Sequence, residues 1–376
     1  MITRKDAERF VLPEFGMDPN FPEEAECSAE HARHLLQVIW PQKYSYDRVL
    51  VAQEPMRNAT LMGMFAVGDT DLDHLGPGHV FYLGLPGTGK TLFAKVPAKV
   101  VRASTARFQG TPDALPSDFT GNRIIDISEN DRRYFRLIKG PGFSFIVVLD
   151  EINRTTPRTQ SAFLELMSEG TITIAGETHT VPSFIIATAN PLENEGVFPM
   201  SEALLDRFMF LVRAHAFTAD QFTEILRRSH EFQNIELRAV CDETAVLKIR
   251  EFFFNTVHVP KEVEERIGRF AEITNSPRAF GCLTDLADEI DDTVIISGLQ
   301  GRGETHLLGA ARIFAAIFKY RNYVTPDDVR AVMLPVLRHR IVFRKGVLRH
   351  FRTLWKQDSI LDTVDTIIKR LIHEAW

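Results

Sequence analysis

The sequence predicts an α/β fold in which helices cover both faces of a parallel sheet and an all-helical domain follows. Two observations support this fold class. Short apolar runs rich in β-branched and aromatic residues alternate with helical patterns from about residue 49 to residue 214, as strands buried on both faces require. After residue 214 the strand signals stop and helical patterns take over, so the sheet is expected to be complete before the second domain begins.

Each expected element has its own local signal. The expected strands are short and apolar, and they are Val80–Leu83, Ala106–Gln109, Phe145–Leu149, Phe184–Ala189 and Met209–Val212. Thr218 and Gln221 form a capping box that begins a helix, and Thr325 begins another, with Pro326 at its first position. The remaining helical patterns are Glu30–Trp40, Glu243–Asn255, Lys261–Thr274, Ala287–Val294 and Leu307–Lys319.

The composition excludes several classes of protein. The chain has 376 residues, more than the ~100–200 of one domain, so two domains are expected. With 44 basic and 50 acidic residues the net charge is −6, which does not suit a protein that coats nucleic acid. No apolar stretch approaches the ~20 residues of a membrane span, the N-terminus lacks a secretory signal, and the three cysteines have no C-x-x-C spacing. We expect a cytoplasmic protein without a disulfide framework.

A phosphate-binding loop follows the first expected strand. Residues 84–91 read GLPGTGKT and fit G-x-x-x-x-G-K-[ST] at every fixed position, between Val80–Leu83 and the helical run Leu92–Val101. The glycines let backbone N–H groups face a phosphate, and the helix N-terminus adds a favourable dipole. Lys90 is expected to reach the β- and γ-phosphates of ATP, and the Thr91 hydroxyl to ligate Mg²⁺. The expected nucleotide-binding residues here are Gly84, Pro86, Gly87, Thr88, Gly89, Lys90, Thr91 and Leu92.

Two acids end the expected strand Phe145–Leu149. In a parallel sheet, Asp150 and Glu151 lie at the carboxyl edge, beside the phosphate loop. We expect Asp150 to hold Mg²⁺, directly or through water, and Glu151 to polarise the attacking water. An acid pair of this kind favours ATP hydrolysis coupled to motion over simple nucleotide binding.

Several further segments resemble the MoxR family of AAA+ ATPases. They are RFQGTPDALPSDFTG (107–121), GPGF (140–143), DEINRTTPRTQ (150–160), ATANP (187–191), LLDRF (204–208) and NYVTPDDVRAVMLPVLRHRI (322–341). The resemblance implies an α/β nucleotide domain with a helical lid, assembled in a ring that is usually hexameric. It also implies a chaperone-like role in which a protein partner is remodelled or activated, often a protein with a von Willebrand factor A (VWA) domain or a metal centre to be matured.

With this resemblance the chain is expected to divide into four parts. These are an N-terminal helical extension (1–45), the AAA+ α/β nucleotide-binding domain (46–215), a helical lid (216–341) and a C-terminal helical tail (342–376).

The resemblance also assigns three further catalytic residues. Asn190 matches the polar sensor that holds the attacking water, although an Asn before Pro191 also suits a plain turn. Arg207 matches the finger arginine that acts on ATP bound by the neighbouring subunit; an ordinary salt bridge is its alternative. Arg302 lies where the lid's sensor arginine would be, although Gln300 and Gly301 depart from the family's usual G-x-S-P-R.

Three segments outside these motifs carry separate expectations. Thr171–Val181 alternates as a hairpin does, and in the family such a hairpin faces the ring pore; a plain surface hairpin fits as well. Gly121–Gly140 matches the position of the family's helix-2 insert, and its charges indicate a solvated face. Gly68–Gly78 reads as a flexible surface insertion, because the Glu that would close a cation-binding loop around its alternating aspartates is absent.

Two other functions remain as alternatives. The segment Val336–Gln357 holds seven basic residues interrupted by aromatics, a texture that suits a nucleic-acid motor or clamp-loader-like protein. Amphipathic lid helices have the same texture, so nucleic acid is the less favoured partner. A ring that binds nucleotide without hydrolysing it is the other alternative, and the presence of Lys90, Asp150, Glu151 and Arg207 disfavours it.

Overall fold

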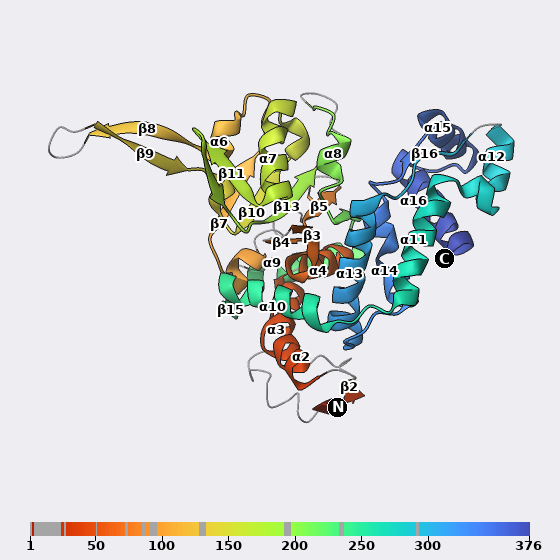
Figure 1. The fold of residues 1–376 in the computed structure, drawn as a ribbon, viewed down its shortest axis with the longest axis horizontal. Helices are drawn as coiled ribbons and strands as arrows, with labels where there is room; N and C mark the ends of the chain where they lie inside the picture. The colour runs from red at the N-terminus through yellow and green to blue at the C-terminus, as the bar shows by residue number, and fades with distance from the viewer. Residues whose placement is uncertain are drawn as a thin grey trace.

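A five-stranded parallel sheet forms the centre of the computed structural model (Figure 1). The structure describes residues 2–3, 24–25, 28–49, 51–71, 74–84, 87–89, 96–127, 133–191, 197–232, 237–290 and 293–376. The strand order is β14-β5-β13-β10-β7, and every neighbouring pair is parallel. The strands are β5 (Val80–Leu83), β7 (Thr105–Gln109), β10 (Ile146–Asp150), β13 (Phe184–Ala189) and β14 (Phe210–Arg213). All five predicted strands are therefore confirmed, each within one residue at either end.

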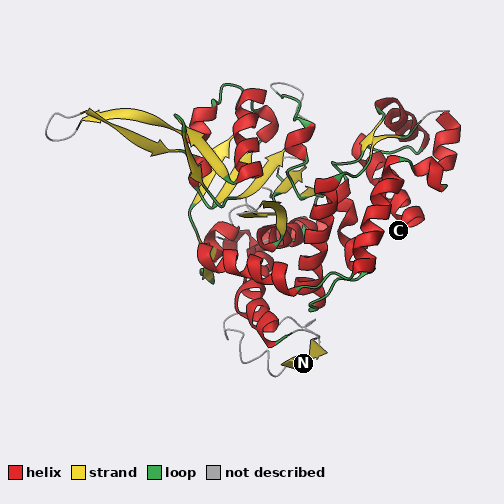
Figure 2. Cartoon of the chain, viewed as in Figure 1, coloured by secondary structure: helices red, strands yellow, loops and turns green. Residues whose placement is uncertain are grey.

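Helices cover both faces of this sheet, as its apolar strands predict (Figure 2). Side chains alternate along each strand: Val80 and Tyr82 enter the core shared with α4 (Glu54–Phe65) and the later helices, whereas Phe81 enters the core shared with α7 (Pro157–Glu169). The sheet is thus sandwiched between two apolar layers. Its carboxyl edge is left for loops, where ligands of parallel sheets bind.

The segment ahead of the sheet is helical over a longer stretch than predicted. The expected helix Glu30–Trp40 is instead a continuous run of α2 (Ala29–His34), the π-helical turn η1 (Leu35–Ile39) and α3 (Trp40–Val49). The buried side chains of this run join the same core as α4.

The second half of the described chain is mainly helical and lies beside the sheet (Figure 1). Its helices are α9 (Ala219–Phe232), α10 (Glu243–Thr256), α11 (Lys261–Asn275), α12 (Thr284–Ile290), α13 (Gly301–Lys319), α14 (Pro326–Leu337), α15 (Lys345–Leu354) and α16 (Ile360–Ala375). The predicted capping box forms, since Thr218 and Gln221 exchange hydrogen bonds. Thr325 is the N-cap of α14 as predicted, and Asp328 also accepts from the Thr325 backbone.

Three details of this half correct the sequence prediction. Helix α13 begins at Gly301, six residues before the predicted start, and so takes Arg302 into its first turn. Helix α12 covers 284–290 instead of 287–294, because Val294 is buried where the chain leads into a strand. Strand signals were expected to stop after residue 214, but β15 (Cys241–Asp242), β16 (Ile295–Ser297) and β17 (Val342–Phe343) form short pairs, β15 with β6 (Val101–Arg102) and β16 with β17.

Two hairpins extend from the sheet domain. The predicted hairpin at 171–181 is confirmed as β11 (Thr171–Ile174) and β12 (Glu177–Thr180), joined by Ala175 and Gly176, which both have positive φ as a tight hairpin turn requires. The segment 121–140, expected to be a charged solvated face, is a protruding hairpin of β8 (Gly121–Ile127) and β9 (Arg133–Lys139) (Figure 1). It also exposes apolar side chains, among them Ile125, Ile127 and Phe135.

The segment 68–78, expected to be a flexible insertion, is instead a packed hairpin. Strands β3 (Val67–Asp71) and β4 (His74–Pro77) pair antiparallel, and β3 packs against α13. Close approach is possible because α13 carries Gly309 there: a Cβ atom on Gly309 would lie 2.2 Å from the Val67 carbonyl oxygen. No group of three or more His, Cys, Asp or Glu in the described part of the chain could hold a metal ion.

Two further findings bear on the composition-based expectations. Among the residues that the structure describes, no helix has both the length and the apolar character that a membrane crossing needs. Cys241 and Cys282 are free thiols, and burial raises the pKa of Cys241 to about 11; Cys27 lies outside the described residues.

Candidate functional site

The glycines after β5 shape an open backbone cradle. Gly87 and Gly89 have φ of 80° and 81°, which favours glycine, and a Cβ atom on either would meet nothing within 4 Å. Gly84 is packed instead, because a Cβ there would lie 2.7 Å from that of Ala214. A cradle of this kind lets backbone N–H groups approach an anion. Four of the predicted binding residues, Pro86, Lys90, Thr91 and Leu92, lie outside the described residues.

Asp150 ends the central strand β10 and is held by two neighbouring strands. The residue is 6% exposed. Arg107 in β7 donates from Nη2 and Nε to Oδ2 at 2.6 and 3.1 Å, and Thr188 in β13 donates to Oδ1. These three bonds use three of the roughly four acceptor positions of a carboxylate. Both carboxylate oxygens are therefore oriented by neighbouring strands.

Glu151 follows in a left-handed backbone conformation. Its φ is 56° and its N–H donates to the Thr188 hydroxyl at 3.1 Å. Gln109 in β7 donates from Nε2 to Glu151 Oε2 at 3.0 Å, and Arg154 Nη1 lies 3.6 Å from the same oxygen. A non-glycine residue in this conformation costs of order 1 kcal/mol. The surrounding bonds therefore fix where the Glu151 carboxylate points.

Three of these holding residues were not predicted from the sequence. Arg107 and Gln109 alternate along β7 and contact the two acids, and Thr188 bonds to both. The sequence signal for Arg107 and Gln109 was that both polar residues lie at the end of a predicted strand. This signal did not assign them to the site, because the sequence predicts the strands but not that β7 lies next to β10.

Asn190 lies at the same edge as the glycine cradle and the two acids. It follows β13, which separates β5 from β10, and it is 7% exposed. Gly84 N donates to the carbonyl of Ala189, the residue before it, at 3.3 Å. The structure therefore brings the described glycines, Asp150, Glu151 and Asn190 together at the carboxyl edge of the sheet.

Arg207 and Arg302 lie elsewhere in the subunit. Arg207 precedes β14, whereas Gly84 follows β5, and these two strands are parallel neighbours. The stretch from Arg207 to Ala214, which packs on Gly84, spans up to roughly 20 Å at about 3.3 Å per residue. Arg302 is at the same end as Arg207, because its Nη1 donates to Asp206 Oδ2 at 2.6 Å. Neither arginine is brought to its own subunit's glycine cradle.

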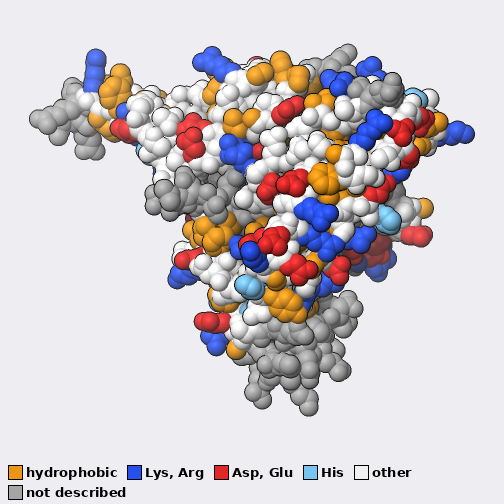
Figure 3. All heavy atoms as spheres, turned by 45° about the vertical axis from the view of Figure 1, so that its right-hand side comes forward, with side chains coloured by type: hydrophobic (Ala, Val, Ile, Leu, Met, Phe, Trp, Pro, Cys, Tyr) orange, Lys and Arg blue, Asp and Glu red, His pale blue; other side chains and the backbone are white. Residues whose placement is uncertain are grey.

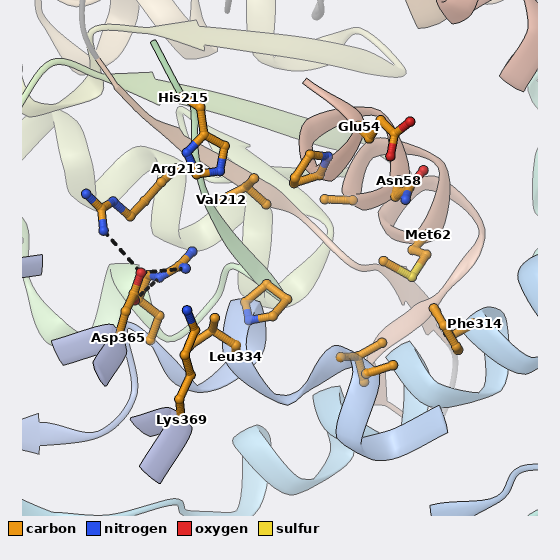
Figure 4. A pocket seen from close by; sticks show the side chains of 16 residues that line it. Glu54, Asn58, Met62, Val212, Arg213, His215, Phe314, Leu334, Asp365 and Lys369 are labelled. Carbon is orange, nitrogen blue, oxygen red and sulfur yellow. Dashed lines mark hydrogen bonds and ion pairs between the residues drawn. The ribbon is translucent and has the colours of Figure 1, made fainter. Parts of the chain in front are cut away.

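A cavity of about 420 Å³ lies at the end of β14 (Figure 4). Residues of α4, the end of β14 and helices α13, α14 and α16 line it, and its charged or polar side chains are Glu54, Asn58, Arg213, His215, Arg338, Asp365 and Lys369. Buried Gln53 donates to the His215 carbonyl at 2.6 Å and accepts from the His215 N–H at 3.2 Å. The bonds between Gln53 and His215 also hold the neighbouring Ala214 in place, and Ala214 packs on Gly84 at the start of the glycine loop.

The residues present fit a nucleotide with Mg²⁺. The open cradle suits phosphate, and Asp150 offers the hard oxygen donor that Mg²⁺ prefers. A site with one protein carboxylate matches the usual Mg²⁺ arrangement, in which phosphates and waters supply most ligands.

Two family models match the chain. The model described as "ATPase family associated with various cellular activities (AAA)" matches residues 79–210, which hold the sheet and the acids. The model described as "AAA lid domain" matches residues 287–357.

Known proteins match over most of the chain. An uncharacterized protein of Bacillus subtilis, YeaC, is 35% identical over 71% of this chain and 78% of its own length. Chaperone MoxR1 of Mycobacterium tuberculosis is 32% identical over 81% of this chain and 76% of its own length. The crystal structure of a putative ATPase from Cytophaga hutchinsonii superposes with a TM-score of 0.73 at 28% identity, covering 91% of this chain and 96% of that one. On the combined evidence of site, lid and relatives, the chain belongs to the MoxR family of AAA+ ATPases.

Proposed function

We propose that this protein hydrolyses ATP as a ring of identical subunits, hexameric as in most of the family, and uses the energy to remodel or activate a protein partner. The observation that carries this proposal is the distribution of the catalytic groups. The glycine cradle, Asp150, Glu151 and Asn190 share one edge of the sheet, whereas Arg207 lies at the other. A site of this kind needs a second subunit to become complete.

Within one subunit, the proposed chemistry divides among the residues of the carboxyl edge. Glu151, held by Gln109, polarises the attacking water, and the Asn190 amide orients that water against the γ-phosphate. Asp150 and the Thr91 hydroxyl hold Mg²⁺, which neutralises charge on the phosphates when bound. Lys90 binds the β- and γ-phosphates.

The cavity at the end of β14 would take the nucleoside half of ATP. Its volume of about 420 Å³ lies within the range of small-ligand pockets, and Ala214, which stands between the lining residues Arg213 and His215 in the chain, packs on Gly84 at the start of the glycine loop.

Arg207 would act on the ATP of the neighbouring subunit. A guanidinium supplied in trans stabilises charge in the transition state and can raise the rate by ~10³–10⁵. Arg302, at the same end of the molecule, would face the same neighbour.

The partner is proposed to be a protein, and nucleic acid is disfavoured. Of the basic C-terminal segment 336–357, Arg338 and Arg340 have side chains only 9% and 2% exposed and are bonded internally. Phe343 and Phe351 are buried too, so they cannot stack on bases. On the face shown in Figure 3, basic and acidic side chains are interspersed.

The first experiment measures phosphate release and nucleotide binding for Glu151→Gln and Lys90→Ala. Glu151→Gln should retain ATP and lose turnover by at least ~100-fold, since it removes the base, whereas Lys90→Ala should lose ATP binding. Turnover by Glu151→Gln equal to that of the wild type would contradict the role of Glu151.

A second experiment mixes Arg207→Ala with Lys90→Ala. Neither variant alone should hydrolyse ATP, but mixed rings place an intact Arg207 beside an intact phosphate loop and should recover activity. Affinity capture with Glu151→Gln in ATP would then identify the client; the two classes proposed from the family resemblance are a VWA-domain protein and a metal-centre protein. A cytoplasmic location is proposed as well, and fractionation of cells tests it.

A further inference from the structure

The end of the lid helix α14 grips the backbone that carries Arg207. Three consecutive residues, Arg338, His339 and Arg340, form what we call the lid clamp. All three direct polar side-chain atoms at main-chain carbonyl groups just before or within β14. The accepting carbonyls belong to Asp206, Phe208, Met209 and Leu211.

Arg340 makes most of these contacts. Its Nη2 donates to the carbonyls of Asp206 and Phe208 at 3.0 and 2.7 Å, and its Nη1 donates to that of Met209 at 3.3 Å. The same guanidinium donates from Nε to Asp206 Oδ1 at 3.1 Å. With a side chain 2% exposed, it is held on all sides and has little freedom to move.

His339 adds a second contact to the Phe208 carbonyl, and Arg338 reaches a further carbonyl within β14. His339 Nε2 lies 2.7 Å from the Phe208 carbonyl oxygen, and Arg338 Nη1 donates to the Leu211 carbonyl at 2.9 Å. Burial, together with the charge of Arg340, lowers the pKa of His339 well below its usual value. The ring is therefore neutral, and the Nε2–H tautomer serves as the donor.

The N–H groups of the gripped segment bond to residues 202–205 and to His79, whereas several of its carbonyl groups accept from the lid clamp. Residues 206–209 belong neither to helix α8 (Glu202–Leu205) nor to β14. Buried carbonyl groups must find a donor, and here the lid supplies it. The Asp206 carboxylate is also shared between Arg340 and Arg302 of α13. Both chain neighbours of Arg207 are thus held by lid residues.

We propose that the lid clamp is a positioning device for Arg207, so that the lid of one subunit controls ATP hydrolysis in the next. This inference rests on the proposed function, in which Arg207 acts in trans. A lid that shifts relative to the sheet pulls the 206–209 backbone with it and moves Arg207 away from the neighbouring phosphate. Arg340 is a positioning residue in this scheme and does not touch the nucleotide.

The test is Arg340→Lys, which keeps the charge but removes the planar fork. We expect kcat for ATP hydrolysis to fall at least tenfold, with KM and the affinity for a fluorescent ATP analogue within twofold of the wild type. Arg330→Lys is the matched control, because Arg330 is an exposed arginine of α14, the helix that leads into the lid clamp; its kcat should not change. A loss of nucleotide affinity in Arg340→Lys equal to the loss of kcat would overturn the inference.

Mixed rings separate positioning from simple structural damage. Lys90→Ala subunits have an intact clamp and Arg207, so mixing them with Arg340→Lys should give more activity than the sum of the two variants alone. If Arg207→Ala recovers with Lys90→Ala but Arg340→Lys does not, the clamp does not act through Arg207 and the inference falls. If neither mixture recovers, the trans site itself is wrong and both proposals fall.

A second variant covers the case in which Arg340→Lys does not fold. Asp206→Asn keeps the size of a side chain that is 34% exposed and removes the charge that Arg302 and Arg340 share. It should show the same fall in kcat, unchanged KM and recovery with Lys90→Ala. A folded Asp206→Asn with wild-type kcat would contradict the inference.

Discussion

At the scale of single residues, the acidic site is defined by what holds its carboxylates. Glu151 has one amide donor, Gln109, on its Oε2 at 3.0 Å, and Asp150 has Arg107. Both holding residues come from β7, the edge strand of the sheet. The two acids are therefore both oriented by side chains of the same neighbouring strand.

Substitution of Gln109 should leave Glu151, the proposed base, in place but without the hydrogen bond that orients it. We expect Gln109→Ala to lower kcat about tenfold, a fraction of the ~10²–10⁴ that a general base contributes, with ATP affinity unchanged. Steady-state hydrolysis together with a nucleotide-binding assay measures both quantities. Gln37→Ala, at an exposed position of η1, is the control, and an undiminished kcat in Gln109→Ala would show that the bond does not orient Glu151.

The residue scale is also where the sequence alone is least informative. The acids and the glycine loop are recognisable because each motif is contiguous in the chain. Arg107 and Thr188 reach Asp150 from strands that lie about 40 residues away on either side. Their role follows from strand order, which depends on tertiary packing and leaves no local signal.

At the scale of elements, the strands were predictable and several helix boundaries were not. Strands β5, β10, β13 and β14 are mainly apolar runs, so their limits are visible in the sequence, whereas β7 (TARFQ) is an edge strand with polar side chains. The start of α13 could not be predicted from the sequence, because Gly301 and Gly303 resemble a helix-breaking turn. In the structure, Gly303 lies in the helix and packs against Leu299 and Arg340. The packed hairpin of β3 and β4 was missed for a similar reason, since its fit depends on Gly309 in a distant helix.

Two helical glycines give a matched pair of stability predictions. Gly309→Ala should destabilise the fold by about 1–3 kcal/mol, because its Cβ would overlap the Val67 carbonyl. Gly268→Ala in α11 meets nothing within 4 Å and should stabilise by up to about 1 kcal/mol through helix propensity. Urea unfolding of both variants measures the two effects, and equal shifts would contradict the packing assigned to Gly309.

The N-terminal helices should make stability depend on pH. His31 of α2 is buried against Phe252 and Phe253, and burial lowers its pKa to about 4. An unfolded histidine binds its proton below about 6.5, so between these values the unfolded state holds more protons. The free energy of unfolding should therefore fall as the pH drops from about 6.5 to about 4, by about 3 kcal/mol.

Substitution identifies the group responsible for this pH dependence. His31→Phe should flatten the change in unfolding free energy over this range, as followed by urea unfolding at several pH values. The exposed His350→Phe is the control and should retain the wild-type slope. A slope that His31→Phe leaves unaltered would assign the effect to other groups.

At the scale of the whole molecule, the proposed shared site makes ATPase activity a property of the assembly. Specific ATPase activity per subunit should rise with protein concentration over the range in which rings form, because isolated subunits lack the second half of each site. Hydrolysis assays paired with sedimentation velocity on the same samples measure this. A monomer with full specific activity would contradict the shared site.

The opposite placement of Arg207 and the glycine loop on the sheet also gives every protomer a direction. Two copies that meet through the same surface would not bring Arg207 of one to the glycine loop of the other, and neither nucleotide site would be complete. Only a head-to-tail contact completes the proposed site. A protomer with both Lys90→Ala and Arg207→Ala would inactivate its own nucleotide site and that of its neighbour. When this double variant is produced together with the wild-type protein in a cell, ATPase activity should fall by more than the fraction of variant subunits.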